Sequence, residues 1–201
     1  MKNHILSIFL QCLLVLLTQR ISAQNVKLSG TILAPTGDSI FLQYSMRTDK
    51  GFETIVLASA ALGEDGSFKL ETELDSARSV MFFDGREVVS VFLVPGDDMT
   101  LNLHTAYFDE TVSFNGKGAA RNNALAGLFL SDEMNGKSIA AMGENADTTV
   151  LFKRIDGNTE RLQAAIADHK VLFPEMDPAL EGLRKEVEFS AKQKKSGIVL
   201  K

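Results

Sequence analysis

The chain has 201 residues, of which 45% are hydrophobic and 23% are charged, with a formal net charge of −5. This length and composition are typical of one globular domain, or of one domain with an appendage. The acidic balance, the absence of tryptophan and the presence of only two tyrosines argue against binding to nucleic acids or to anionic membrane surfaces.

The first 23 residues have the pattern of a secretory signal peptide. Lys2 supplies a positive charge, 5–17 is an apolar run of about 13 residues, and Ile21-Ser22-Ala23 places a small residue before Gln24. A helix needs about 20 apolar residues to span a bilayer, so the run is too short for a membrane anchor, which is the alternative interpretation. We therefore expect cleavage near Ala23 and export, to the periplasm of a diderm bacterium.

The signal peptide also contains the only cysteine of the chain, Cys12. Gln11 precedes it, whereas a lipoprotein needs a small residue there, which argues against acylation. Cleavage would leave 178 residues without cysteine, with 19 basic and 26 acidic side chains and a net charge of about −7. Such a protein has neither a disulfide nor a thiol nucleophile, and it contains no second apolar run long enough to span a membrane.

Residues 24–116 have the period of short β-strands separated by polar turns. Residues 67–74 alternate most clearly, because Phe68, Leu70 and Leu74 share one face and charged residues occupy the other. Asp84-Gly85 is one of several strong turn signals. The pattern predicts an antiparallel sandwich or barrel of about eight strands, which we place at 26–33, 39–44, 52–60, 67–74, 80–83, 88–94, 99–104 and 111–114.

Residues 117–190 have a helical period, so we expect an α+β protein. Helices are predicted at 119–130 and 148–173, with a polar loop at 131–147 between them. Asp177-Pro178 is a typical helix start, and the basic run in 191–201 suggests a flexible tail. The helix at 148–173 has an apolar stripe with two polar members and a weak point at Gly157; the stripe consists of Phe152, Ile155, Thr159, Leu162, Ile166, His169 and Phe173.

Several polar groups were considered as chemical sites, and each has a simpler structural interpretation. Gly116-Lys117-Gly118 lacks the spacing of a P-loop or of a dinucleotide fingerprint, which favours a strand-to-helix turn. Asp97-Asp98 and Asp65-Gly66 lack the surrounding oxygen ligands of a calcium loop, and carboxylates in tight turns usually bond their own backbone.

The two histidines outside the signal, His104 and His169, lie in different halves of the chain without zinc-like ligand spacing. Glu186 and Glu188 are two residues apart on a predicted helix and therefore point to different sides. The chain also lacks the Gly-x-Ser-x-Gly motif of a nucleophile elbow. We accordingly predict no catalytic, cofactor-binding or metal-binding residue, no cofactor, and no enzymatic activity.

Four segments together resemble a bacterial domain of unknown function. This domain commonly precedes the thioredoxin-like domain in exported thiol-disulfide oxidoreductases of the TlpA/AhpC type. The similarity covers residues 25 to about 190, and its motifs are Val26-Lys27-Leu28-Ser29-Gly30-Thr31-Ile32, Gly63-Glu64-Asp65-Gly66-Ser67-Phe68, Phe92-Leu93-Val94-Pro95-Gly96-Asp97-Asp98 and the segment from Phe114 to Asn123.

The resemblance implies an accessory module rather than a redox enzyme, because the family's Cys-x-x-Cys pair and its thioredoxin domain are absent from this sequence. We expect the module to dock on an envelope protein or on a detached thioredoxin-like domain. The apolar end Ile198-Val199-Leu200 fits a redox domain lost by truncation. The alternative is a periplasmic protein that binds a small molecule or lipid in a pocket of the β-domain or between sheet and helices.

Overall fold

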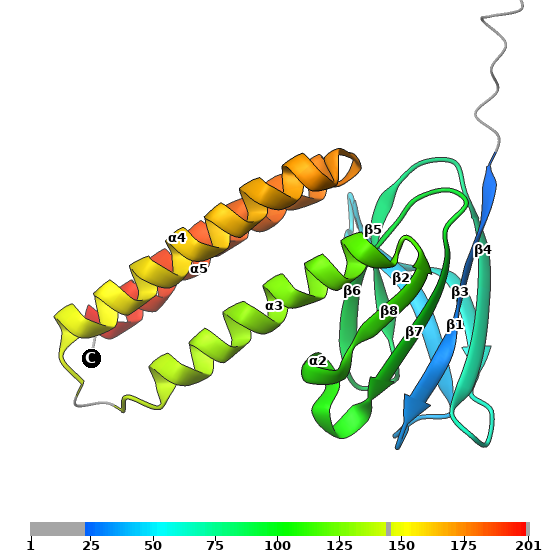
Figure 1. Ribbon diagram of the computed structural model, residues 1–201, viewed down its shortest axis with the longest axis horizontal. Helices are drawn as coiled ribbons and strands as arrows, with labels where there is room; N and C mark the ends of the chain where they lie inside the picture. Colours follow the sequence, from blue (N-terminus) through cyan, green and yellow to red (C-terminus); the bar gives the residue numbers. More distant parts are fainter. Residues whose placement is uncertain (1–22, 144–145, 200–201) are drawn as a thin grey trace, which may run out of the picture.

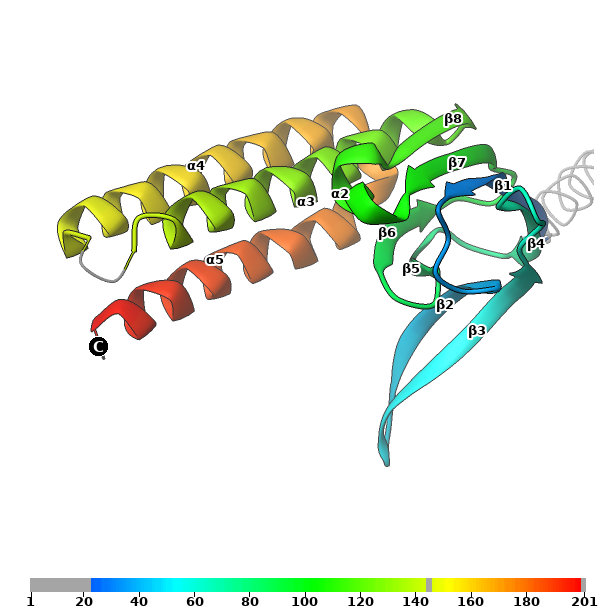
Figure 2. The same ribbon diagram turned by 90° about the horizontal axis from the view of Figure 1, so that it is seen from below.

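The computed structural model describes residues 23–143 and 146–199. Two four-stranded sheets form a sandwich, and three long helices extend away from one side of it (Figure 1; Figure 2). The α+β class and the eight predicted strands are confirmed. The predicted signal peptide lies outside the described residues, apart from Ala23.

The strands are arranged in two sheets of equal size. One sheet has the order β4-β1-β7-β8 and the other has the order β3-β2-β5-β6. The strand bounds are β1 (Gln24–Leu33), β2 (Ser39–Thr48), β3 (Gly51–Ala61), β4 (Ser67–Leu74), β5 (Arg78–Phe83), β6 (Val88–Leu93), β7 (Asp98–His104) and β8 (Ser113–Lys117). The strands β6 and β8 are therefore sheet edges, and the helices emerge directly after β8.

One ladder differs from the predicted antiparallel sandwich, because β1 and β7 pair in parallel. All strands of the second sheet lie between them in the sequence. The chain therefore returns to the first sheet by a long crossover, and only such a connection permits parallel pairing. The sandwich is thus mostly antiparallel with one parallel ladder, which alternation within single strands does not reveal.

The predicted alternation in β4 is confirmed, since Phe68, Leu70 and Leu74 are buried and the intervening charged residues are exposed. Inward-facing residues of both sheets form one continuous core. The members with the least exposed surface include Ile40, Leu42, Phe82, Val91, Leu93 and Leu101. These side chains fill the space between the sheets, which is one of the two places where the alternative function would put a ligand.

Helix α3 (Ala119–Ala140) is longer than predicted. The predicted loop at 131–147 is wrong for its first ten residues, which continue the helix. The segment is polar because much of it faces solvent. It remains helical because Glu133 and Lys137 form an ion pair one turn apart and because α3 packs along α4.

Helices α4 (Thr148–Leu172) and α5 (Asp177–Val199) form an antiparallel hairpin beside α3, joined by the short helix η2 (Pro174–Met176) (Figure 2). Their shared core also includes Phe92 of β6. At its start the buried face of α4 is rotated relative to the predicted stripe; its buried residues are Leu151, Ile155, Asn158, Leu162 and Ile166. None of the helices in the described part of the chain is both long and apolar enough to cross a membrane.

The predicted flexible tail is wrong for residues 191–199, which belong to α5. Two of its lysines have acidic partners on the neighbouring helices. Lys195 binds Asp156 of α4, and the Nζ atom of Lys194 lies 3.7 Å from the Oδ1 atom of Asp132 on α3. The basic residues therefore extend the helix hairpin instead of ending it.

Two glycines give a direct test of the fold. Gly66 has φ +76°, and a Cβ atom there would lie 2.1 Å from the carbonyl oxygen of Ile32, whereas a Cβ atom on Gly157 in α4 would meet nothing within 4 Å. We expect Gly66→Ala to lower the free energy of unfolding by at least about 2 kcal/mol. Gly157→Ala should raise it by about 0.5–1 kcal/mol. Urea denaturation of both variants measures the effects, and changes of the same sign would contradict this placement of the two glycines.

Candidate functional site

Two consecutive asparagines connect α3 to both sheets. The backbone N–H of Phe92 in β6 donates to Oδ1 of Asn122 (2.7 Å), and Nδ2 of Asn122 donates to the carbonyl of Phe92 (3.0 Å). Asn123 makes the same pair of bonds with Phe114 in β8, both at 2.8 Å. Each amide side chain pairs with an edge strand as a neighbouring strand would. We call these two contacts the asparagine joint.

A buried ion pair reinforces the asparagine joint. The guanidinium of Arg121 donates through Nη2 to Oδ2 of Asp97 and through Nε to the carbonyl of Phe92. Arg121 is 9% exposed and Asp97 is 2% exposed, and the same carboxylate oxygen accepts the N–H of Val94 (2.8 Å). Loss of one partner from such a pair typically costs about 3–5 kcal/mol, because the other charge stays buried.

These contacts give a structural role to Asp97 and to the turn Gly116-Lys117-Gly118. Asp97 is committed to Arg121 and the backbone, so its carboxylate is a structural group. Gly118 has φ +103°, and a Cβ atom there would lie 2.8 Å from both Asp97 and Arg121. Gly116-Lys117-Gly118 is therefore a strand-to-helix turn that brings Arg121 against Asp97.

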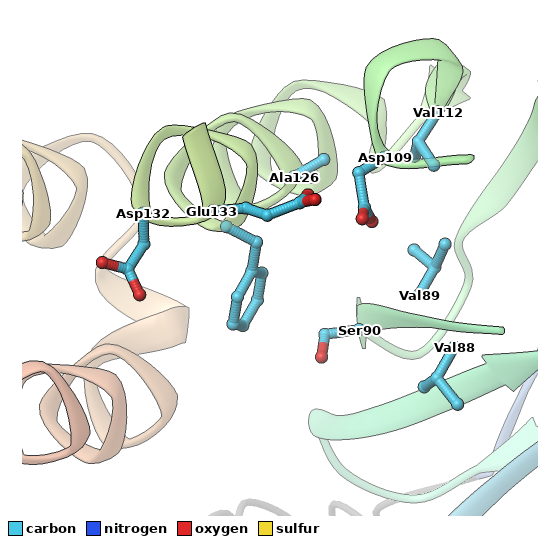
Figure 3. Close-up of a pocket in the computed structure, with 9 residues that line it drawn as sticks. Val88, Val89, Ser90, Asp109, Val112, Ala126, Asp132 and Glu133 are labelled. Carbon is cyan, nitrogen blue, oxygen red and sulfur yellow. The ribbon is translucent and has the colours of Figure 1, made fainter. Parts of the chain in front are cut away.

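A cavity of about 480 Å³ opens where α3 moves away from the sandwich. Its walls come from β6, from the short helix α2 (Phe108–Thr111) with the residue that follows it, and from α3 (Figure 3). We call it the β6–α3 pocket; it is lined by Val88, Val89, Ser90, Asp109, Val112, Ala126, Phe129, Asp132 and Glu133. Its volume lies within the range of about 300–1,000 Å³ typical of ligand sites.

Two carboxyl groups face each other across the pocket, Asp109 from α2 and Glu133 from α3 (Figure 3). Desolvation, and then hydrogen bonding and repulsion from Glu133, raise the pKa of Asp109 to about 6. Lys137 has the opposite effect on Glu133, because its hydrogen bond holds the pKa of Glu133 below the usual value. The proton of the pair is therefore placed on Asp109, and Glu133 stays ionised.

The third acidic lining residue, Asp132, is directed away from the other two (Figure 3). Its Oδ1 atom accepts a hydrogen bond from Nδ2 of Asn158 on α4 (3.1 Å). Asp132 thus belongs to the contacts among the helices. The chemistry of the pocket consists of one acid pair beside apolar walls.

The other predicted candidates are not brought together. The Nδ1 atom of His104 accepts the N–H of Ala106 (3.1 Å), and the Nδ1 atom of His169 lies 2.5 Å from the carbonyl oxygen of Ala165. Asp65 accepts the N–H of Ser67 (3.0 Å), as a turn carboxylate does. Within 23–143 and 146–199, no group of three or more histidine, cysteine or acidic side chains is placed to hold a metal ion.

Sequence reasoning missed the acid pair. Asp109 lies in a four-residue helix between β7 and β8, and Glu133 lies in the segment that was predicted to be a loop. Sequence reasoning missed the asparagine joint as well. The two consecutive asparagines after the glycine turn were the available signal for this joint, because side-chain amides at the start of a helix are typical partners for backbone groups.

The pH dependence of stability tests the acid pair. The raised pKa of Asp109, about 6 against the usual 3.8, means that the folded protein binds this proton more tightly than the unfolded chain. Stability should therefore fall as the pH rises from about 4 to 6. We expect Asp109→Asn to raise the free energy of unfolding at pH 7.5 by about 1 kcal/mol, since solvent screens much of the repulsion.

Thermal unfolding at pH 4 and at pH 7.5 measures this effect. The variant should unfold roughly 2–4 °C higher than the parent protein at pH 7.5 and at about the same temperature at pH 4. A carboxyl signal of Asp109 that titrates near pH 4 in NMR spectra would contradict the pair.

Searches of protein-family models, of curated proteins and of solved structures found no match to this chain. The resemblance to the accessory domain of TlpA-type proteins therefore stays a prediction from its motifs.

Proposed function

We propose that the chain is an exported, non-catalytic accessory module that docks on an envelope protein and holds it at a fixed position relative to the sandwich. The asparagine joint, with the ion pair of Arg121 and Asp97, is the observation that carries this proposal. It fixes the first turn of α3 to both sheets. A helical arm attached in this way keeps its direction, which is the property that a positioning module needs.

The arm also has apolar side chains available for contact. Val171 and Leu172 at the end of α4 and Phe189 on α5 are among the most exposed large hydrophobic residues. Val171 and Leu172 are neighbours in the chain, and contiguous exposed apolar residues are typical of interaction surfaces. By the resemblance in the sequence, a detached thioredoxin-like domain is one candidate partner.

The proposal of a non-catalytic role has two supports. The only cysteine lies in the predicted signal peptide, so the exported chain has no thiolate with which to exchange disulfides. Both histidines outside the predicted signal peptide, His104 and His169, have a ring nitrogen engaged by the backbone of their own helix or turn. The β6–α3 pocket favours a second candidate function, the binding of a small molecule, because its volume and its apolar walls suit one.

Export can be tested in the apolar run of the signal peptide. We expect Leu14→Arg to abolish secretion of the full chain fused to a periplasmic reporter enzyme, because a charge interrupts the short apolar core. Val171→Arg, which adds the same charge on the exposed end of α4, is the matched control and should be exported normally. Sequencing of the exported control should give Gln24 as its first residue. Secretion of the Leu14→Arg chain at the normal level would reject the export proposal.

The fixed direction of the arm can be measured by spin labelling. Cysteines replacing Lys69 on β4 and Lys185 on α5, whose side chains are 75% and 69% exposed, provide two labels in a chain that starts at Gln24 and has no other cysteine. We expect a single narrow distance distribution by double electron–electron resonance. Asn122→Ala should broaden it, because the N–H of Phe92 loses its partner and the carbonyl of Phe92 keeps only the bond from Nε of Arg121, at a cost of about 1–3 kcal/mol.

Asn135→Ala makes the same change on α3 away from the sandwich and should leave the distribution narrow. Circular dichroism confirms that each labelled variant is folded. A broad distribution in the parent chain would reject a positioning role.

A further inference from the structure

Strand β6 has one free edge, and its register shows which residues face outward. The carbonyl of Glu87 accepts the N–H of Asp84 across the turn, so odd-numbered residues of β6 bond to β5. Even-numbered residues face the other way, as the bonds between Phe92 and Asn122 confirm. In antiparallel pairing this alternation continues along the strand. Val88 and Ser90 therefore present their N–H and C=O groups away from β5.

The outward positions of β6 are Val88, Ser90 and Phe92, and Asn122 covers only Phe92. Within the part of the chain that the structure describes, no hydrogen bond from α2 or α3 reaches the outward groups of Val88 or Ser90. Val88 is also 44% exposed. An unpaired edge of this kind is a template for one more strand.

The free edge lies directly at the β6–α3 pocket, because Val88 and Ser90 are lining residues (Figure 3). A segment that pairs with both residues would make up to about four backbone hydrogen bonds, and its alternate side chains would point into the pocket. The walls that receive such a side chain are apolar at Val112 and Ala126 and acidic at Asp109 and Glu133.

The charges around the pocket select the sign of that side chain. Asp109 feels the negative charges of Glu133, Glu110 and Glu87. Lys137 is shared, since its Nζ atom binds Glu133 and lies 3.9 Å from Glu110. In the described residues Asp109 has no cation within salt-bridge distance. Lys137 is therefore the cation of Glu133 and Glu110, and an entering lysine or arginine side chain would supply one for Asp109.

We propose that β6 docks an extended segment of a partner protein, which pairs with Val88 and Ser90 and places a lysine or arginine side chain between Asp109 and Glu133. This inference rests on the proposed docking function and names the chemistry of the partner. Asn122 already shows the mode of binding, because its amide occupies the same strand edge one position further along. Among the four edge strands β3, β4, β6 and β8, β6 is the one that lines the pocket with the acid pair.

A pair of short peptides tests the proposal. The probe is the acetylated and amidated pentapeptide Thr-Val-Lys-Val-Thr, and its control has glutamate in place of lysine. We expect the lysine peptide to bind about 10-fold more tightly than the glutamate peptide. It should also slow hydrogen exchange at the amides of Val88 and Ser90, as measured by NMR of the chain from Gln24 onward.

Variants separate the two parts of the site. Asp109→Asn combined with Glu133→Gln should reduce the preference for lysine from about 10-fold to less than about 3-fold. Glu53→Gln, on the exposed part of β3, should leave it unchanged. Ser90→Pro removes one outward N–H, a change that edge strands tolerate, and it should weaken binding by about fivefold or more.

Three results would overturn the inference: equal binding of the two peptides, protection of β3 or β4 in place of β6, or butylammonium binding as tightly as the peptide. The last result would identify the pocket as a site for small amines. If the spin-label distance distribution is narrow and one of these three results is found, strand docking is rejected and the positioning role is not. A broad distribution with specific peptide binding rejects the positioning role alone.

Discussion

The structure depends on two side-chain amides that each replace a β-strand. Consecutive residues of a helix point about 100° apart, so Asn122 and Asn123 diverge from one turn of α3 toward the edges of two sheets stacked about 10 Å apart. One amide binds Phe92 of β6 and the other binds Phe114 of β8. Both sheets are therefore held at one point, and the helices that pack on α3 take their positions from it.

The same constraint creates the pocket. In the described residues, the hydrogen bonds from α3 to the strands all come from its first turn, so the helix leaves the strand edge further along, and the space that opens is lined by Val88 and Ser90. Exposed edges are a risk, because they invite unwanted pairing between copies of a protein. The acid pair of Asp109 and Glu133 reduces that risk, since a chain of net negative charge repels a second copy, and it leaves the edge open to a basic partner.

The elements that could be predicted are those with a local signal. Alternation placed the strands, and the period of about 3.6 together with Asp177-Pro178 placed two of the helices. The parallel ladder, the last ten residues of α3 and the helical end of α5 could not be predicted, because they depend on partners distant in sequence. Asp97 illustrates the limit: the sequence favoured a turn carboxylate that bonds its own backbone, as it does with the N–H of Val94, but it did not reveal the ion pair with Arg121, 24 residues later.

The proton of Asp109 links binding to pH. Glu133 is kept ionised by Lys137 and Asp109 holds a proton up to a pKa of about 6, so an entering cation must compete with that proton. Glu110 and Glu87 add negative charge from the same side, which favours the proton and the cation alike. The proton and the cationic side chain exclude each other because both neutralise the carboxylate of Asp109. In the docking that we propose, the raised pKa of Asp109 sets the acidity at which a basic segment is released.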